Sequence, residues 1–249
     1  MSEFIFYHIE KCMGTSMRYS FYEYFINLFN RKEIHIPGVI KELENINLVN
    51  KENYDIIISK NGYEYLEKLK VICCHFRDDI YKFNPKMKVT CLRNPIDRFV
   101  SHYYFFTYND LQISLKEAVE QNCHCLYKNV ITMRLTNYSG DIYEAKQKLK
   151  EFDYILIQEN IDDDIKELNK LMNEKFTVDH ELALNTKNVT KNVTKNVTKN
   201  VTKNKLNDGD LNDIIMREYC FLDIEIYNYA LELRGLEHLM IKRRMIENE

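Results

Sequence analysis

The chain has 249 residues, of which 45% are hydrophobic and 12% aromatic. This is enough for one sizeable core and too little for two comfortable ones. The formal net charge of -3 excludes a general basic field for nucleic acid, so any anion must be bound by locally placed groups. We therefore expect a single domain over residues 1–249 with no nucleic-acid partner.

The seven cysteines include the adjacent pair Cys73 and Cys74 and the pair Cys123 and Cys125. Neither pair has the CxxC spacing of a zinc or thiol-redox site, so we expect no metal and read most cysteines as small buried hydrophobic residues. The chain shows no secretory signal and no uninterrupted apolar stretch of about 18 residues. These features predict a soluble, cytoplasmic protein without an integral membrane segment.

The chain opens with a β-prone apolar segment over residues 4–9. A glycine-containing turn follows, and over 15–29 aromatic residues recur at helical spacing. Further short apolar runs suit buried strands and are separated by helical or polar sequence, at residues 54–58, 70–74, 88–92 and 154–157. The alternation predicts an α/β fold in which helices flank a parallel sheet in three layers.

Three later segments carry helix signals. Asn94 can cap a helix over 95–108 that has Pro95 at its first position. Asn160 and the three aspartates that follow it mark a second helix start. Apolar residues at helical spacing over 211–236 predict closing helices.

The tetrapeptide Lys-Asn-Val-Thr occurs four times in succession, in a low-complexity insert over residues 187–204. It lacks the apolar content to pack, so we expect a mobile loop. Its Asn-Val-Thr triplets match the N-glycosylation pattern, but without a secretory signal chance repetition is the better interpretation. Its lysines are either an electrostatic guide for an anion or a solvated repeat.

The segment from His8 to Ser16 lies where the first strand gives way to a helix. Unpaired backbone N–H groups and the helix dipole favour an anion there. Gly14 permits close backbone approach, Lys11 supplies a cation, and the hydroxyls of Thr15 and Ser16 add donors. The lysine precedes the glycine, so this is not a Walker loop. The alternative is an ordinary turn with an exposed lysine.

A second anion site is indicated between Leu92 and His102, again at a strand end. Arg93 can form a fork of hydrogen bonds to a phosphate, and the helix brings Ser101 near. The alternative is a surface pair of Arg93 and Arg98 with Asp97. Two anion sites together suggest one ligand with phosphates at both ends.

The two segments resemble those of the carbohydrate sulfotransferases that use 3′-phosphoadenosine-5′-phosphosulfate (PAPS), a group that includes the heparan sulfate O-sulfotransferases. In that family a Lys-[Thr/Ser]-Gly-Gly-Thr-[Ser/Thr] loop holds the 5′-phosphosulfate, and its positions match Lys11, Cys12, Met13, Gly14, Thr15 and Ser16. The family's Leu-Arg-[Asp/Asn]-Pro-x-x-Arg-x-x-Ser segment binds the 3′-phosphate and matches Leu92 through Ser101.

The resemblance extends more weakly through 129–134, the strand 152–157 and 185–187, a segment like the loop that closes over the nucleotide. It implies a P-loop-NTPase-like sulfotransferase fold, PAPS as co-substrate, and transfer of its sulfuryl group to a hydroxyl of a carbohydrate or related acceptor, without a metal. Met13 departs from the pattern, because a bulky residue stands where the family has a small one and either crowds the loop or requires its backbone to adjust.

The resemblance also implies catalytic roles. Lys11 is placed to stabilise the leaving phosphate, and His75, in a position like the family's His-Phe, is placed as the base. A carboxylate base at Glu159 is the alternative to His75, whereas His8 and His102 suit the scaffold better. Two other functions remain open: a nucleotide kinase, which needs magnesium and a triphosphate, and a protein that binds the nucleotide or a sulfated glycan without turnover. The sequence carries no signal for the acceptor's identity or for an oligomeric state.

Overall fold

A computed structural model of the chain describes residues 3–26, 28–29, 34–35, 69–75, 84–107, 113–123, 126–184 and 209–241. The chain forms two compact units: Met1–Leu92 with Lys150–Asn200, and Arg93–Leu149 with Val201–Glu249. The predicted strand at 54–58 and the repeat insert at 187–204, with the segment 185–187 before it, lie outside the described residues.

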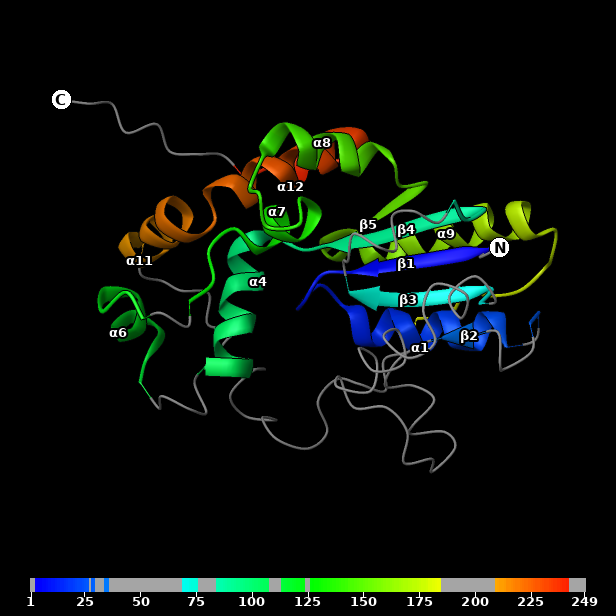
Figure 1. The fold of residues 1–249 in the computed structure, drawn as a ribbon, viewed down its shortest axis with the longest axis horizontal. Coiled ribbons are helices and arrows are strands. Elements are labelled where there is room, and N and C mark those ends of the chain that lie inside the picture. Colours follow the sequence, from blue (N-terminus) through cyan, green and yellow to red (C-terminus); the bar gives the residue numbers. More distant parts are fainter. Residues whose placement is uncertain are drawn as a thin grey trace. The chain divides into compact units, whose positions relative to one another are not determined.

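The first unit is built on a parallel sheet with the strand order β2-β3-β1-β4-β5 (Figure 1). The strands are β1 (Phe4–His8), β2 (Ile34–His35), β3 (Val71–His75), β4 (Met87–Leu92) and β5 (Tyr154–Ile157). Every residue of β1 is buried, so this central strand is covered on both faces. The chain thus has the α/β fold with a parallel sheet flanked by helices that its alternating pattern predicts.

Two helices of the first unit pack on the same side of β1. The rings of Phe4 and Phe6 lie 4.7 Å and 5.0 Å from Phe21 of α1 (Gly14–Phe25). Phe25 of α1 in turn meets the ring edge of Phe176 at 5.2 Å, at the end of α9 (Ile161–Phe176). The aromatic spacing of α1 is therefore the spacing of its buried face.

Helix α9 begins where the sequence predicts, but Asn160 does not cap it. The 3-10 turn η4 (Gln158–Asn160) precedes it, and the Asn160 side chain makes no capping bond to the backbone. Instead the fully buried Asp164 accepts hydrogen bonds from Ile157 N (2.5 Å) and Asn160 Nδ2 (2.8 Å). This carboxylate ties the end of β5 to the first turn of α9.

In the second unit the described elements are all helical. They are α4 (Pro95–His102), η3 (Tyr103–Thr107), α6 (Leu115–Glu120), α7 (Val130–Leu135), α8 (Ile142–Lys150), α11 (Gly209–Ile214), η6 (Ile215–Tyr219), α12 (Phe221–Leu233) and η7 (Glu237–Leu239). The predicted start of α4 is confirmed: Asn94 Oδ1 accepts from Ile96 N (3.0 Å) and Asp97 N (3.4 Å), with Pro95 at the first position. After His102 the predicted helix widens into the π-helical turn η3.

The core of the second unit lies around α4, α6 and the closing helices. Phe99 of α4 and Tyr219 of η6 pack with ring centroids 5.0 Å apart, and Leu115, Ala118 and Ile224 join the same buried cluster. The predicted closing helices are present, but they are divided at Cys220, where η6 ends and α12 begins. None of the helices in the described part of the chain has both the length and the apolar character needed to cross a bilayer.

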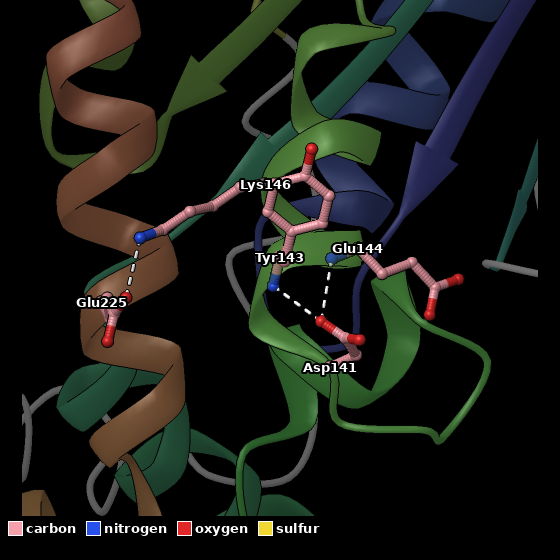
Figure 2. A network of polar contacts seen from close by, with 5 residues as sticks. All are labelled: Asp141, Tyr143, Glu144, Lys146 and Glu225. Atoms are coloured by element: carbon pink, nitrogen blue, oxygen red, sulfur yellow. Dashed lines mark hydrogen bonds and ion pairs between the residues drawn. The ribbon is translucent and has the colours of Figure 1, made fainter.

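Helix α8 is fixed at its start and along its side (Figure 2). Asp141 Oδ1 accepts from Tyr143 N (2.8 Å) and Glu144 N (3.1 Å), which caps the first turn. Further along, Lys146 Nζ lies 2.7 Å from Glu225 Oε1 of α12. The two side chains of this ion pair are 31% and 40% exposed, so solvent screens the pair and it contributes little to stability.

Candidate functional site

Three of the predicted site segments lie at or directly after the carboxyl ends of three neighbouring strands. In the register of the sheet, His8 of β1 lies level with His75 of β3 on one side and Cys91 of β4 on the other. The loop with Lys11 continues from β1, and Arg93 is the residue after the last residue of β4. Adjacent strands are about 4.8 Å apart. The carboxyl ends of parallel strands are where open α/β sheets bind ligands.

The loop after β1 is a tight turn with two residues in left-handed conformations. Lys11 has φ 67° and Met13 has φ 55°, and Cys12 between them is fully buried. Cys12 N donates to Ile9 O at 3.2 Å. Cys12 belongs to the buried core, whereas Lys11 and Met13 on either side of it are partly exposed.

The N-terminus of α1 is suited to an anion. The helix starts at Gly14 with no side-chain cap and no acidic residue in its first turn. In contrast, α6 has a complete capping box, in which Glu117 N donates to Ser114 Oγ (3.2 Å) and Ser114 N to Glu117 Oε2 (2.7 Å). Met13 therefore supplies no side-chain acceptor to the first N–H groups of α1, and such groups fit a phosphate or sulfate oxygen.

Gly14 is required at its position by His8. The His8 side chain is 7% exposed, and a Cβ placed on Gly14 would fall 1.8 Å from its Nε2 atom. The imidazole therefore lies directly against the backbone at the start of α1. This supports the scaffold role that the sequence suggests for His8, and the alternation of Phe4, Phe6 and His8 on one face of β1 is the signal for it.

The segment after β4 has a different basis for anion binding. Asn94 already accepts hydrogen bonds from the first turn of α4, and Asp97 adds negative charge there. This helix N-terminus is therefore not an anion site by itself, so a phosphate must be bound by side chains. Arg93 and Ser101 are both partly exposed and can supply them.

Arg98 is not the surface arginine of the alternative interpretation. Its side chain is 1% exposed, and it is the largest fully buried side chain among the described residues. Asp97 next to it is exposed. The sequence did not indicate this difference, because charge pattern alone does not separate a buried arginine from a solvated one.

The two candidate bases lie at different distances from β1. His75 ends β3, which pairs directly with β1, and its side chain lies outside the described side chains, as does that of Thr15. Glu159 is exposed in η4 after β5, and β4 separates β5 from β1. Two strand spacings are about 10 Å. The topology therefore brings His75 closer than Glu159 to the loop that follows β1.

Comparison with known proteins agrees with this arrangement. The family model described as the sulfotransferase domain matches residues 8–216, which is more than half of the chain and includes both strand-end segments. No curated protein matches the chain. Sulfotransferases move a sulfuryl group to an acceptor substrate and generally take it from PAPS. The extent of the match shows that the chain belongs to the sulfotransferase family.

Proposed function

We propose that this sulfotransferase uses PAPS and transfers its sulfuryl group to a hydroxyl of a carbohydrate or related acceptor. The observation that carries the proposal is the N-terminus of α1, which follows the Lys11 loop and has no side-chain cap. The family match runs through segments of both compact units. This supports one sulfotransferase domain over residues 1–249, with an insert at 187–204.

Each end of the nucleotide has a proposed partner. The 5′-phosphosulfate would lie on the first turn of α1, where Lys11 and the backbone of Cys12, Met13 and Gly14 precede the hydroxyl-bearing Thr15 and Ser16. The 3′-phosphate would be bound by Arg93 and Ser101. The order β3-β1-β4 supports one ligand for both segments, because they continue from adjacent parallel strands.

The proposed reaction is an in-line displacement at sulfur. The acceptor oxygen forms a bond to sulfur while the bond from sulfur to the 5′-phosphate oxygen breaks. His75 takes the proton of the acceptor hydroxyl, and Lys11 with the N–H groups of α1 stabilises the charge on the departing phosphate. The products are the sulfate ester, adenosine 3′,5′-bisphosphate and a proton.

Calorimetric titration with adenosine 3′,5′-bisphosphate tests the nucleotide part of this proposal. We expect binding in the micromolar range and a loss of about tenfold or more for Lys11→Ala and for Arg93→Ala, since each removes a charge-assisted contact. Lys166→Ala is the matched control, because Lys166 pairs with the exposed Asp163 and its side chain is 76% exposed. Preference for magnesium ATP would instead support a nucleotide kinase.

An acceptor panel tests the catalytic part. The expected result is transfer of labelled sulfate from PAPS to at least one carbohydrate or other hydroxyl acceptor, with His75→Ala lowering kcat by about 10²-fold or more. Binding of the bisphosphate with no transfer over a broad panel would favour a nucleotide-binding protein without turnover. No nucleotide binding at all would overturn the proposal.

A further inference from the structure

A cluster of buried polar side chains lies under α4 in the second unit. It contains Arg98 on α4, Cys220 before α12 and Asp223 in the first turn of α12, all at most 1% exposed. Buried charges are rare unless they are paired or perform a task. The proposed chemistry uses none of these three groups directly, so their placement needs its own explanation.

Asp223 connects α12 to α7. Its Oδ2 accepts from Ile131 N (3.0 Å), and its Oδ1 accepts from Thr132 N (2.8 Å) and Thr132 Oγ1 (2.9 Å). The two N–H donors are backbone groups in the first turn of α7, so Asp223 caps a helix other than its own.

Asn129 makes the reciprocal connection. It is the residue before α7, yet it gives its own helix no side-chain cap. Its Oδ1 instead accepts from Leu222 N (3.0 Å) in the first turn of α12, and its backbone N donates to Tyr219 O (2.7 Å). The two helix starts therefore cap each other, which fixes them as one body.

Arg98 and Cys220 join α4 to this body. Cys220 Sγ donates to Pro95 O at 3.6 Å. The positive charge of Arg98 opposes the rise that burial causes in the pKa of the Asp223 carboxyl, and it has the same effect on the Cys220 thiol. Within the described residues, Nε and Nη1 of Arg98 have no hydrogen-bond partner. The guanidinium is therefore held by packing and by charge more than by directed bonds.

The orientation of α4 decides where the anion-binding side chains of this segment lie. Ser101 is three residues after Arg98 and so lies on a neighbouring part of the same helix face. Arg98 N donates to Asn94 O at 2.9 Å, and Arg93 is the residue before Asn94. A rotation of α4 about its axis would thus move both Arg93 and Ser101. In catalysis a misplacement of about 1 Å can cost a factor of about 10² in rate, so small shifts of positioned groups are costly.

We propose that Arg98 and Asp223 are positioning residues that hold Arg93 and Ser101 in the geometry for a phosphate monoester on the ribose. The buried side chain of Arg98 and the contact of Cys220 Sγ with Pro95 O hold α4 against the starts of α7 and α12, which Asp223 ties together. The inference rests on the proposed function, in which Arg93 and Ser101 bind the 3′-phosphate.

The test compares two nucleotides that differ only in the group concerned. Dissociation constants of adenosine 3′,5′-bisphosphate and adenosine 5′-monophosphate are measured by calorimetry for the wild type, Arg98→Met and Asp223→Asn. The positioning role predicts that both variants weaken bisphosphate binding about tenfold or more, while monophosphate binding changes less than about twofold. Arg98→Lys, which keeps a buried charge, should recover part of the loss.

Asn228→Ala is the matched control for lost stability. Asn228 also lies on α12, but it exchanges hydrogen bonds with the backbone of Ile241 (3.0 Å and 2.9 Å) instead of α7 or α4. We expect it to lower Tm while the ratio of the two dissociation constants stays at the wild-type value. A merely structural role of Arg98 and Asp223 predicts the same behaviour for their variants, and that result would overturn the inference.

The double variant Arg98→Met/Asp223→Asn keeps the test decisive if a single variant does not fold. It removes both buried charges, so neither remains uncompensated. A folded double variant that has lost the discrimination between the nucleotides supports positioning, and one that retains it overturns positioning. If the wild type itself does not discriminate between the two nucleotides, the proposed 3′-phosphate site fails, which is a separate outcome.

Discussion

The ring of His8 occupies the space that a Cβ on Gly14 would need, with His8 Cδ2 and Nε2 each 1.8 Å from that position. Real Cβ atoms essentially never come within 3.0 Å of another heavy atom, so the ring and the helix start cannot both keep their places if residue 14 has a side chain. The packing of the His8 ring therefore requires glycine at position 14, and close approach of a ligand to the loop would require it as well.

Gly14→Ala should lower the free energy of unfolding by about 1–3 kcal/mol, because the His8 ring must leave a fully packed site. The measurement is thermal unfolding of the variant. Adding His8→Ala should recover a large part of the loss, since the clash is then removed. Gly235→Ala is the control: it has φ 66° but no atom within 4 Å of the new Cβ, so its backbone cost should not change with His8→Ala. An unchanged Tm for Gly14→Ala would contradict the packing argument.

Met13→Gly should stabilise the protein. Met13 has φ 55°, a left-handed conformation that costs a residue with a Cβ about 1–2 kcal/mol, whereas glycine adopts it freely. The greater backbone entropy of glycine in the unfolded chain offsets part of the gain, so we expect about 1 kcal/mol and a rise in Tm of a few degrees. Met13→Ala keeps the Cβ and is the control: a gain there equal to that of Met13→Gly would mean that side-chain bulk was the problem.

Four of the five described strands and the start of α4 were predictable because their signals are local, whereas the two-residue strand β2 was not predicted. Short apolar runs gave β1, β3, β4 and β5 to within a residue or two, and Asn94 with Pro95 gave the start of α4. The reciprocal caps were not predictable, because Asp223 and Ile131 are 92 residues apart in the chain. The sequence left two effects of Met13 open: its side chain crowds the loop, or the backbone of the loop adjusts. The left-handed φ of Met13 favours the backbone effect.

Substitution of Asn129 should show how much the reciprocal caps contribute to the free energy of unfolding. Asn129→Ala removes the acceptor for Leu222 N and keeps a Cβ at φ 49°, so we expect a loss of about 1–2 kcal/mol in chemical denaturation. Asn129→Gly also removes the cap but tolerates the left-handed conformation, so its loss should be smaller. If the two variants are equally destabilised, the backbone conformation contributes little and the cap accounts for the whole effect. Wild-type stability in both would contradict a structural role for the cap.

Ionisation of the Tyr24 phenol should lower the stability of the protein at alkaline pH. Its hydroxyl donates to Asn173 Oδ1 at 2.7 Å, and burial raises the pKa of the phenol from 10.0 to about 12. Since the folded pKa lies above the unfolded value, the contribution of Tyr24 is fully present below pH 10 and is lost as pH rises towards 12. The wild type should therefore lose more Tm between those values than Tyr24→Phe, which has no proton to lose. Tyr143→Phe is the control, because Tyr143 is 70% exposed and its substitution should leave the alkaline slope unchanged. Equal slopes for the wild type and Tyr24→Phe would show that the Tyr24 phenol titrates alike in the folded and unfolded chains.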